Sequence, residues 1–469
     1  MISIIFAKIN VFLQKRYTMG IKIRITIMNF LQFFIWGAWL ITIGGYWFQN
    51  RHWTGTDFGV IFSTMGIASL FMPAIAGIIA DRWINAEKLL GIFHIMGAAV
   101  LFILPKVNDP TTFFWVMLLN MVFYMPTISL AITVAYSALK GAGLDVIKSY
   151  PPIRVFGTIG FIVAMWTVSL LKFETSAMQF YVASGASLTL GVFSFSLPKC
   201  TVNKNVRSKN LVDMLGLKAF TLFKNPKMAM FFIFSMMLGA SLQLTNAYGD
   251  TFLHDFSKVP KYADLISIYE KITIPNLHEI IGFFNKISYL MGVENLIPML
   301  VLKYPAIIMS ISQMSETLFI LAIPFFLLRF GIKKVMLISM VAWVLRFALF
   351  GFGNPAEALW MIILSNIIYG MAFDFFNISG SLFVETQTDS SIRASAQGVF
   401  MMMTNGFGAI LGSWSSGLMI DHYFKDAAGN FEWQGIWLTF AAYSLVVAIL
   451  FAFLFRHKHH PNEVAVLNH

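Results

Sequence analysis

Residues 304–328 read YPAIIMSISQMSETLFILAIPFFLL, an apolar run that carries one carboxylate, Glu316, near its middle. About 20 apolar residues are needed to cross the hydrocarbon core of a bilayer. A second run, 357–384, holds Asp374 in the same way, and neither acid has a Lys or Arg within one helical turn. A charged side chain at the bilayer centre costs about 2.5–3.5 kcal/mol on insertion scales, so such residues usually face a watery cavity.

Similar runs recur along the whole chain of 469 residues, which is 58% hydrophobic and only 12% charged. A soluble domain carries about 25% charged residues. We therefore predict an all-α polytopic membrane protein with twelve transmembrane helices arranged as two pseudo-symmetric six-helix halves. The spans are expected at about 25–48, 57–80, 88–105, 112–138, 152–171, 176–197, 229–252, 304–328, 334–353, 357–384, 394–419 and 434–455.

The formal net charge of +11 would suit a nucleic-acid partner, but the distribution of the 33 Lys and Arg residues favours another reading. Most of them fall in connections that this topology assigns to the cytoplasm, as the positive-inside rule expects. We predict a multi-pass membrane protein with both termini in the cytoplasm. Its partners are the lipid bilayer and small solutes, with no nucleic acid, and the protein is expected to be a monomer.

The longest basic connection divides the predicted spans into two groups of six. Similar loops that contain Gly and Arg recur at matching places in the two groups, which suggests a repeated six-helix unit. Residues 1–24 read as a cytoplasmic segment, with Met19 as an alternative start. The predicted parts are bundles at 25–197 and 229–456, a cytoplasmic linker at 198–228, an exported insert at 258–302 and a cytoplasmic tail at 457–469. The insert reads equally well as amphipathic helices at the outer mouth or as a packing cap.

Polar residues in the spans fall into stripes at helical spacing. One stripe holds Arg154, Thr158 and Phe161; others pair Gln243 with Asn246, and Gln313 with Glu316. Any single amide could instead bond a neighbouring helix. Stripes on several helices favour one shared cavity, to which we add the candidate lining residues Gln32, Trp36, Asn120, Tyr124, Tyr369, Phe373 and Asn377.

Amides with one or two carboxylates suit a neutral solute with several hydroxyls, and flat aromatic faces suit a planar ring. Stacking of a base on an aromatic side chain contributes about 1–3 kcal/mol in nucleic-acid binders. Asp374 follows Phe373 and is turned about 100° away from it, toward a neighbouring helix. At that position Asp374 is better suited to carry a proton than to contact the solute directly. The alternative is that Asp374 has a purely structural role.

Other charged residues in or near the spans have simpler readings. Arg346 is expected to snorkel or to form a structural pair, and His94 to be a satisfied packing histidine. Glu385 could pair with Arg393 as a gate or have no role. The one cysteine, Cys200, excludes an intramolecular disulfide.

Signatures of catalysis and metal binding are missing from the sequence. It has no Gly-x-Ser-x-Gly elbow and no phosphate-binding loop, and His278-Glu279 lacks the second His of a zinc helix. The His-rich tail reads as solvated. We predict no enzyme, no cofactor and no metal site, so a gradient must supply the energy.

The loop pattern of Gly77, Asp81 and Arg82 is similar to the cytoplasmic loop motif of the major facilitator superfamily. Four stretches together resemble one family within it, the nucleoside:proton symporters, which are the bacterial nucleoside and xanthosine permeases of the inner membrane. They are FLQFFIWGAWL at 30–40, PPIRVFGTIGF at 151–161, SQMSETLF at 312–319 and YGMAFDFFNISG at 369–380. The resemblance covers nearly everything from Met19 to Arg456. The loop lacks the usual downstream basic cluster, the insert 258–302 is longer than usual, and Ser241 stands where an acid is expected.

The resemblance implies twelve helices, alternating access and import of nucleosides together with protons. It implies a nucleoside site built from Arg154, Thr158, Phe161, Gln243, Asn246, Gln313, Glu316, Tyr369 and Phe373, with proton coupling through Asp374 and Glu316. Two alternatives stay open: a permease for another polar solute such as a sugar or oligosaccharide, and a membrane nucleoside sensor that does not transport.

Overall fold

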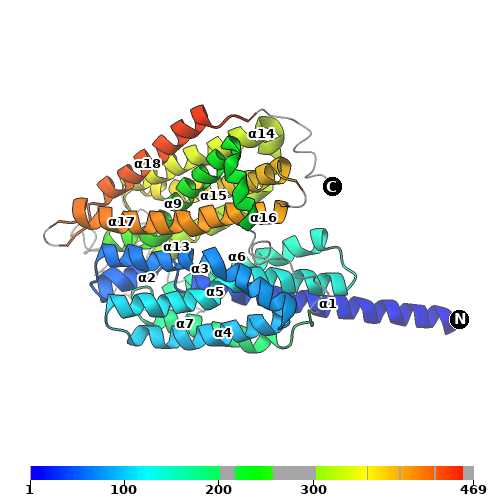
Figure 1. Cartoon of the computed structure of the whole chain (residues 1–469). Coiled ribbons are helices and arrows are strands. Elements are labelled where there is room, and N and C mark those ends of the chain that lie inside the picture. The colour runs from blue at the N-terminus through cyan, green and yellow to red at the C-terminus, as the bar shows by residue number, and fades with distance from the viewer. Residues whose placement is uncertain are drawn as a thin grey trace. The chain divides into compact units, whose positions relative to one another are not determined.

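The computed structural model describes residues 2–200, 217–256, 303–355, 357–389, 392–426 and 429–457 (Figure 1). Apart from one isolated bridge between Lys425 and Phe431, these ranges contain helices, turns and coil. The predicted insert 258–302 lies outside the described residues, as do most of the predicted linker and all of the tail beyond His457. The all-α prediction is confirmed.

The helices of the first part of the chain follow the predicted spans with short additions between them. They are α1 (Ile2–Gly37), α2 (Ile43–Gly45), the π-helix η1 (Tyr46–Asn50), α3 (Gly55–Arg82), α4 (Ala86–Ile103), the 3₁₀ turn η2 (Leu104–Lys106), α5 (Pro110–Gly141), α6 (Val146–Leu170) and α7 (Met178–Ser194). Helix α5 begins at a proline preceded by Asp109, whose carboxylate accepts a hydrogen bond from the Thr112 backbone N–H at 2.8 Å. This is an N-cap with proline in the first turn, where its missing N–H costs nothing.

The second part repeats this pattern. Its elements are the 3₁₀ helix η3 (Leu217–Lys224), α9 (Pro226–Asp255), α13 (Pro305–Met309), α14 (Ile311–Phe352), α15 (Leu359–Gln387), α16 (Arg393–Met401), the π-helix η6 (Met402–Gly408), α17 (Ala409–Tyr423) and α18 (Trp433–Leu454). Pro226 opens α9 after Asn225, whose side chain accepts from the Lys227 backbone N–H at 2.9 Å. The same capping chemistry therefore begins both long helices.

Eight helices in the described part of the chain are long and apolar enough to cross a membrane by length and composition. One of them, 305–352, holds two predicted spans that meet at Gly331, where φ is 75° and ψ is 169°. Helix α7 has 17 residues, and the eleventh predicted span is divided into α16, η6 and α17. With α1, these segments correspond to the twelve predicted spans.

The segment expected as a span at 25–48 is not one continuous helix. Helix α1 ends at Gly37, and α2 and η1 follow as separate short elements. A Cβ at Gly44 would lie 2.2 Å from Thr251 Oγ1, so this segment packs against α9 at backbone distance. Hydropathy cannot reveal that break, because the residues on both sides of it are apolar.

Two compact units divide the chain. The first holds Met1–Trp39, Thr64–Ala164 and Ala177–Ala219, and the second holds Leu40–Ser63, Met165–Ser176 and Phe220–His469. The second unit thus contains two segments from the first part of the sequence. One is anchored there by Asp421, which accepts hydrogen bonds from the backbone N–H groups of Gly55 at 3.0 Å and Thr56 at 2.6 Å.

Candidate functional site

The two membrane acids are positioned by a close crossing of α14 and α15 in the second unit. A Cβ at Gly370 would lie 2.6 Å from the Ser315 carbonyl carbon and 2.7 Å from the Glu316 backbone nitrogen. The Gly370 N–H donates to Ser315 Oγ at 3.3 Å, and Ser315 Oγ donates to the Ile367 carbonyl. Glycine is required here because any side chain would push the helices apart. The crossing places Glu316 beside the turn of α15 that carries Tyr369 and Asp374.

The environments of the two acids differ. Glu316 is half-buried, whereas Asp374 is only 4% exposed and its Oδ2 has no hydrogen-bond donor among the described residues. The two acids therefore differ in how far water can reach them, although both belong to the crossing of α14 and α15.

An aromatic wall continues from the acids along α15. The rings of Tyr369 and Phe373 are stacked, with centroids 5.8 Å apart and planes 5° from parallel. Trp343 meets Tyr369 edge-on at 6.0 Å. The spacing of 369 and 373 predicted a shared stripe, and the structure shows that their rings are also parallel.

Of the two readings expected for Arg346, the structure excludes snorkelling and favours a structural role. Arg346 does not snorkel toward water, because it is fully buried, with its guanidinium 4.7 Å from the Tyr369 ring centroid and 5.0 Å from that of Phe350. Its Nη1 donates to the Ser365 carbonyl at 2.6 Å and its Nε to Thr245 Oγ1 at 3.4 Å. A lone Arg in an apolar span carries no sequence signal for such stacking, so the sequence could not identify it as part of the site.

A small pocket lies beside this wall, entirely within the second unit. It is lined by side chains from α9, α14, α15 and η6: Leu238, Gly239, Leu242, Trp343, Ala372, Phe373, Phe376, Asn377, Thr404 and Asn405. Two predicted site residues, Phe373 and Asn377, are among them. An apolar, aromatic lining with a few amides is typical of a small-molecule site.

The polar residues of α9 and α14 lie at the predicted helical spacing. Gln243 is 7% exposed, and its Oε1 has no hydrogen-bond donor in the described part of the chain. Asn246, Gln313 and Glu316 are half-buried. Ser241, noted as a departure from the family pattern, lies 3.3 Å from Ser444 through the two hydroxyl oxygens. It therefore has a packing role on the other side of α9.

The predicted residues of α6 lie in the first unit, against α1. The Arg154 guanidinium is 4.0 Å from the centroid of the Phe33 ring. A Cβ at Gly157 would lie 2.7 Å from Arg154 Nη1, and a Cβ at Gly160 would lie 2.1 Å from the Phe30 carbonyl oxygen. These glycines allow the helices to touch and hold the Arg154 side chain flat on the ring. Thr158 is half-buried and Phe161 buried.

Gln32 and Tyr124, predicted as cavity-lining residues, belong to a buried hydrogen-bond network of the first unit. Gln32 Nε2 donates to Thr127 Oγ1 at 2.8 Å, its Oε1 is 2.8 Å from His94 Nε2, and the Tyr124 hydroxyl donates to the Gln32 carbonyl at 2.7 Å. His94 Nδ1 is 3.2 Å from Ser187 Oγ. The prediction of a satisfied packing histidine is confirmed, and Gln32 is occupied by its protein partners.

The remaining candidates near this network are Trp36 and Asn120. Trp36 lies 5.7 Å from the Tyr124 ring, and its indole N–H has no acceptor among the described residues. Asn120 is 2% exposed, and its amide points to Met117 Sδ at 4.0 Å. Trp36 therefore keeps a free donor for a solute, whereas Asn120 is enclosed by protein.

Two predictions concern the helix ends. Asp81 and Arg82 end α3, and a Cβ at Gly77 would meet nothing within 4 Å. The predicted pair of Glu385 and Arg393 is confirmed, with Oε1 and Nη1 2.8 Å apart. Both side chains are more than a third exposed, so the pair contributes about 0–1 kcal/mol to stability.

Comparisons with known proteins agree with this geometry. Residues 19–460 match the family described as Nucleoside H+ symporter. The chain is 50% identical to the xanthosine permease of Escherichia coli K12, over 95% of this chain and 98% of that one. It is 47% identical to the nucleoside permease NupG of the same organism, over 94% and 97%.

Solved structures of other transporters share the fold of this chain. The crystal structure of the nucleoside transporter NupG matches with a TM-score of 0.81 at 47% identity, covering 93% of this chain and all of that one. A bacterial homologue of the lysosomal transporter Spinster matches with a TM-score of 0.61 at 12% identity, which supports the fold alone.

Buried acids beside an aromatic pocket, in a helical membrane protein whose fold matches solved transporters, define a secondary transporter of the major facilitator fold. The chain belongs to the Nucleoside H+ symporter family. Because this family and these relatives are transporters, the prediction that the chain is not an enzyme is confirmed.

Proposed function

We propose that this chain imports nucleosides together with protons across the bacterial inner membrane by alternating access. One observation carries the proposal: the stacked rings of Tyr369 and Phe373 stand on the same turns of α15 as Asp374, beside Glu316 of α14. The crossing of α14 and α15 thus carries both a flat aromatic face and carboxylates that can bind a proton. The proposal combines this geometry with membership of the family.

The substrate's base and sugar need different groups. The free face of Phe373, which lines the pocket, suits a planar base, for which stacking contributes about 1–3 kcal/mol. The hydroxyls of a ribose can bond amides and a carboxylate, the roles proposed for Gln243, Asn246, Gln313 and Glu316. Gln243 Oε1 in particular needs a donor, because a buried acceptor without one is costly.

Arg154, Thr158 and Phe161 are also proposed to bind nucleoside. The Arg154 guanidinium lies over the Phe33 ring, 4.0 Å from its centroid. A planar fork of donors is suited to the oxygen and nitrogen acceptors of a base edge. These three assignments rest on the family resemblance, and Arg154→Ala should abolish uptake of labelled uridine while the protein remains in the membrane.

Proton coupling is proposed for Asp374 and Glu316. When both are ionised their charges repel, and a proton bound to either relieves that repulsion. Release of the proton to the cytoplasm would use the membrane potential, worth about 2.3 kcal/mol per charge per 100 mV. The proposed arrangement places both termini in the cytoplasm and the chain in the bilayer as a monomer of two six-helix halves.

Reconstituted protein tests the function directly. Proteoliposomes with an inward proton gradient should accumulate labelled uridine, and collapsing the gradient should abolish accumulation. Glu316→Gln should lose uptake, whereas Asp389→Asn, a charge-neutralising change at an exposed position, should keep it. Unchanged uptake in Glu316→Gln would remove Glu316 from the proposed site.

A panel of competitors separates the alternatives. Nucleosides, xanthosine among them, should compete with uridine, and sugars should not. Competition by oligosaccharides alone would point to a permease for that solute. Saturable nucleoside binding without any net flux into sealed vesicles would point to a sensor and would refute the transport proposal.

A further inference from the structure

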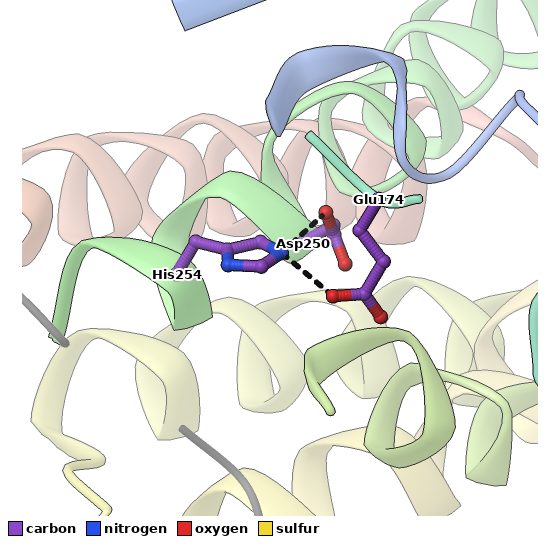
Figure 2. A group of neighbouring side chains, drawn as sticks. All are labelled: Glu174, Asp250 and His254. Atoms are coloured by element: carbon purple, nitrogen blue, oxygen red, sulfur yellow. Dashed lines mark ion pairs between the residues drawn. The ribbon is translucent and has the colours of Figure 1, made fainter. Parts of the chain in front are cut away.

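Three side chains that can coordinate a metal ion lie together in the second unit, outside the proposed nucleoside site (Figure 2). Asp250 and His254 are one turn apart near the end of α9, and Glu174 lies in the connection between α6 and α7. His254 Nε2 is 2.9 Å from Glu174 Oε2 and 3.6 Å from Asp250 Oδ2. One ligand atom from each residue lies within 4.8 Å of the other two.

The surrounding backbone holds this cluster in place. Glu174 uses its other oxygen, Oε1, to accept a hydrogen bond from the Ala306 N–H at the start of α13, at 3.1 Å. A Cβ at Gly45 of α2 would lie 3.3 Å from the Glu174 carbonyl oxygen and 3.6 Å from Asp250 Oδ2. The absence of a side chain at this position lets α2 cover the carboxylate closely. Four chain segments therefore meet at one small polar centre.

Burial makes the charges of this cluster hard to explain by protein partners alone. Asp250 is 0% exposed, and neither of its carboxylate oxygens receives a hydrogen bond from the described residues. Glu174 is 4% exposed. A buried carboxylate is normally paired, hydrogen-bonded or bound to a metal. Asp250 is aimed at the imidazole of His254 and lacks the donors that a stable buried ion pair requires.

We propose that Glu174, Asp250 and His254 form a binding site for a divalent transition-metal ion of the Zn²⁺ class. Two carboxylates and a neutral imidazole carry a charge of −2, which one divalent ion cancels. Imidazole with carboxylates is a donor set that suits zinc, and three protein ligands with a fourth open position are typical of accessible zinc sites.

The observed separations fit that ion. Ligand atoms about 2.0–2.2 Å from Zn²⁺ in a tetrahedron lie about 3.3–3.5 Å from one another. The two distances from His254 Nε2, 2.9 and 3.6 Å, bracket this value. All three ligand atoms lie within 4.8 Å of one another, and the His254 side chain is 12% exposed.

A bound ion would tie the connection between α6 and α7 to α9 and, through Ala306, to α13. If the chain transports by alternating access, as proposed above, an ion that ties these segments together would restrain any movement between them during the cycle. Metal bound on the exported side would then slow uptake reversibly. This consequence rests on the proposed function, whereas the binding site itself does not.

The binding experiment uses the full-length protein in detergent without a polyhistidine tag and without nucleoside. His457, His459 and His460 are replaced by Ala in every sample, so that the tail does not bind metal. Co²⁺ is titrated as a spectroscopic probe, because its visible d–d absorption reports coordination. We expect tetrahedral-type bands that saturate at one equivalent and disappear when Zn²⁺ is added.

Matched variants locate the ion. Asp250→Asn and Glu174→Gln preserve side-chain volume and should weaken Co²⁺ binding at least tenfold, since even outer-shell changes cost about 10–100-fold. His422→Gln, at an exposed histidine of α17, should bind as the parent does. Absence of the bands in the parent would overturn the proposal and leave a shared proton as the occupant of the cluster. Equal affinity in both folded carboxylate variants would overturn it as well.

Discussion

The Arg346 guanidinium lies over the Tyr369 ring, 4.7 Å from its centroid, while the ring of Phe373 stacks on Tyr369 at 5.8 Å. A buried cation, a phenol and a phenyl ring therefore support one another along the wall of the proposed nucleoside site. Arg346 also donates to the Ser365 carbonyl, so its position is set by the backbone of α15. We infer that Arg346 positions Tyr369.

Replacing Arg346 by Lys should raise the KM for nucleoside roughly 2- to 30-fold, with a smaller effect on kcat. Lys keeps the charge but loses the planar stack, and a cation–π contact is worth about 0.5–2 kcal/mol. Initial uptake rates over a range of uridine concentrations measure both constants. Arg329→Lys is the matched control, because Arg329 lies 5.8 Å from the Phe330 ring at an exposed position. An equal rise in both variants would contradict a positioning role.

Asp374→Asn should abolish accumulation against a gradient and retain exchange of labelled for unlabelled nucleoside. The amide keeps the shape of the side chain and cannot take up a proton, so the carrier can still move the solute downhill. Counterflow and gradient-driven uptake in the same vesicles measure the two activities. Full uphill uptake by the variant would remove Asp374 from proton coupling.

Gly370→Ala should destabilise the protein by about 1–3 kcal/mol, because the new methyl group would lie 2.6 Å from the Ser315 backbone. The midpoint of thermal unfolding in detergent, followed by fluorescence, should fall accordingly. Gly185→Ala in α7 is the control, since a Cβ there meets nothing within 4 Å. That substitution should be neutral or slightly stabilising, as expected for Ala in a helix. A normal midpoint for Gly370→Ala would show that the crossing can relax.

Cys200 offers a prediction of pH dependence outside the membrane spans. Burial raises the pKa of its thiol, because burial disfavours the charged thiolate, the form that reacts. Maleimide labelling of the folded protein should therefore be slow at pH 7 and should increase only above the ordinary thiol range. Labelling of the unfolded chain gives the unperturbed profile. Coincident profiles would show that the thiol is accessible.

Hydropathy and helical spacing were sufficient to predict the helices, the two membrane acids and the stripes of polar and aromatic residues. An apolar run of about 20 residues must become a helix in lipid, because its backbone has no other hydrogen-bond partners there. The same reasoning located Glu316 and Asp374, since a charge in such a run is exceptional. Short stripes such as Tyr369 with Phe373 followed from the 3.6-residue period.

Tertiary structure decided what each polar side chain contacts. Gln32 and Gln243 look alike in sequence, yet Gln32 is bonded to His94 and Thr127 while the Gln243 oxygen has no donor among the described residues. Arg346 gives no sequence sign that it stacks on Tyr369. Glu174 lies far along the chain from Asp250 and His254. Spacing within one helix fixes a face, but only the packing of different helices determines which faces meet.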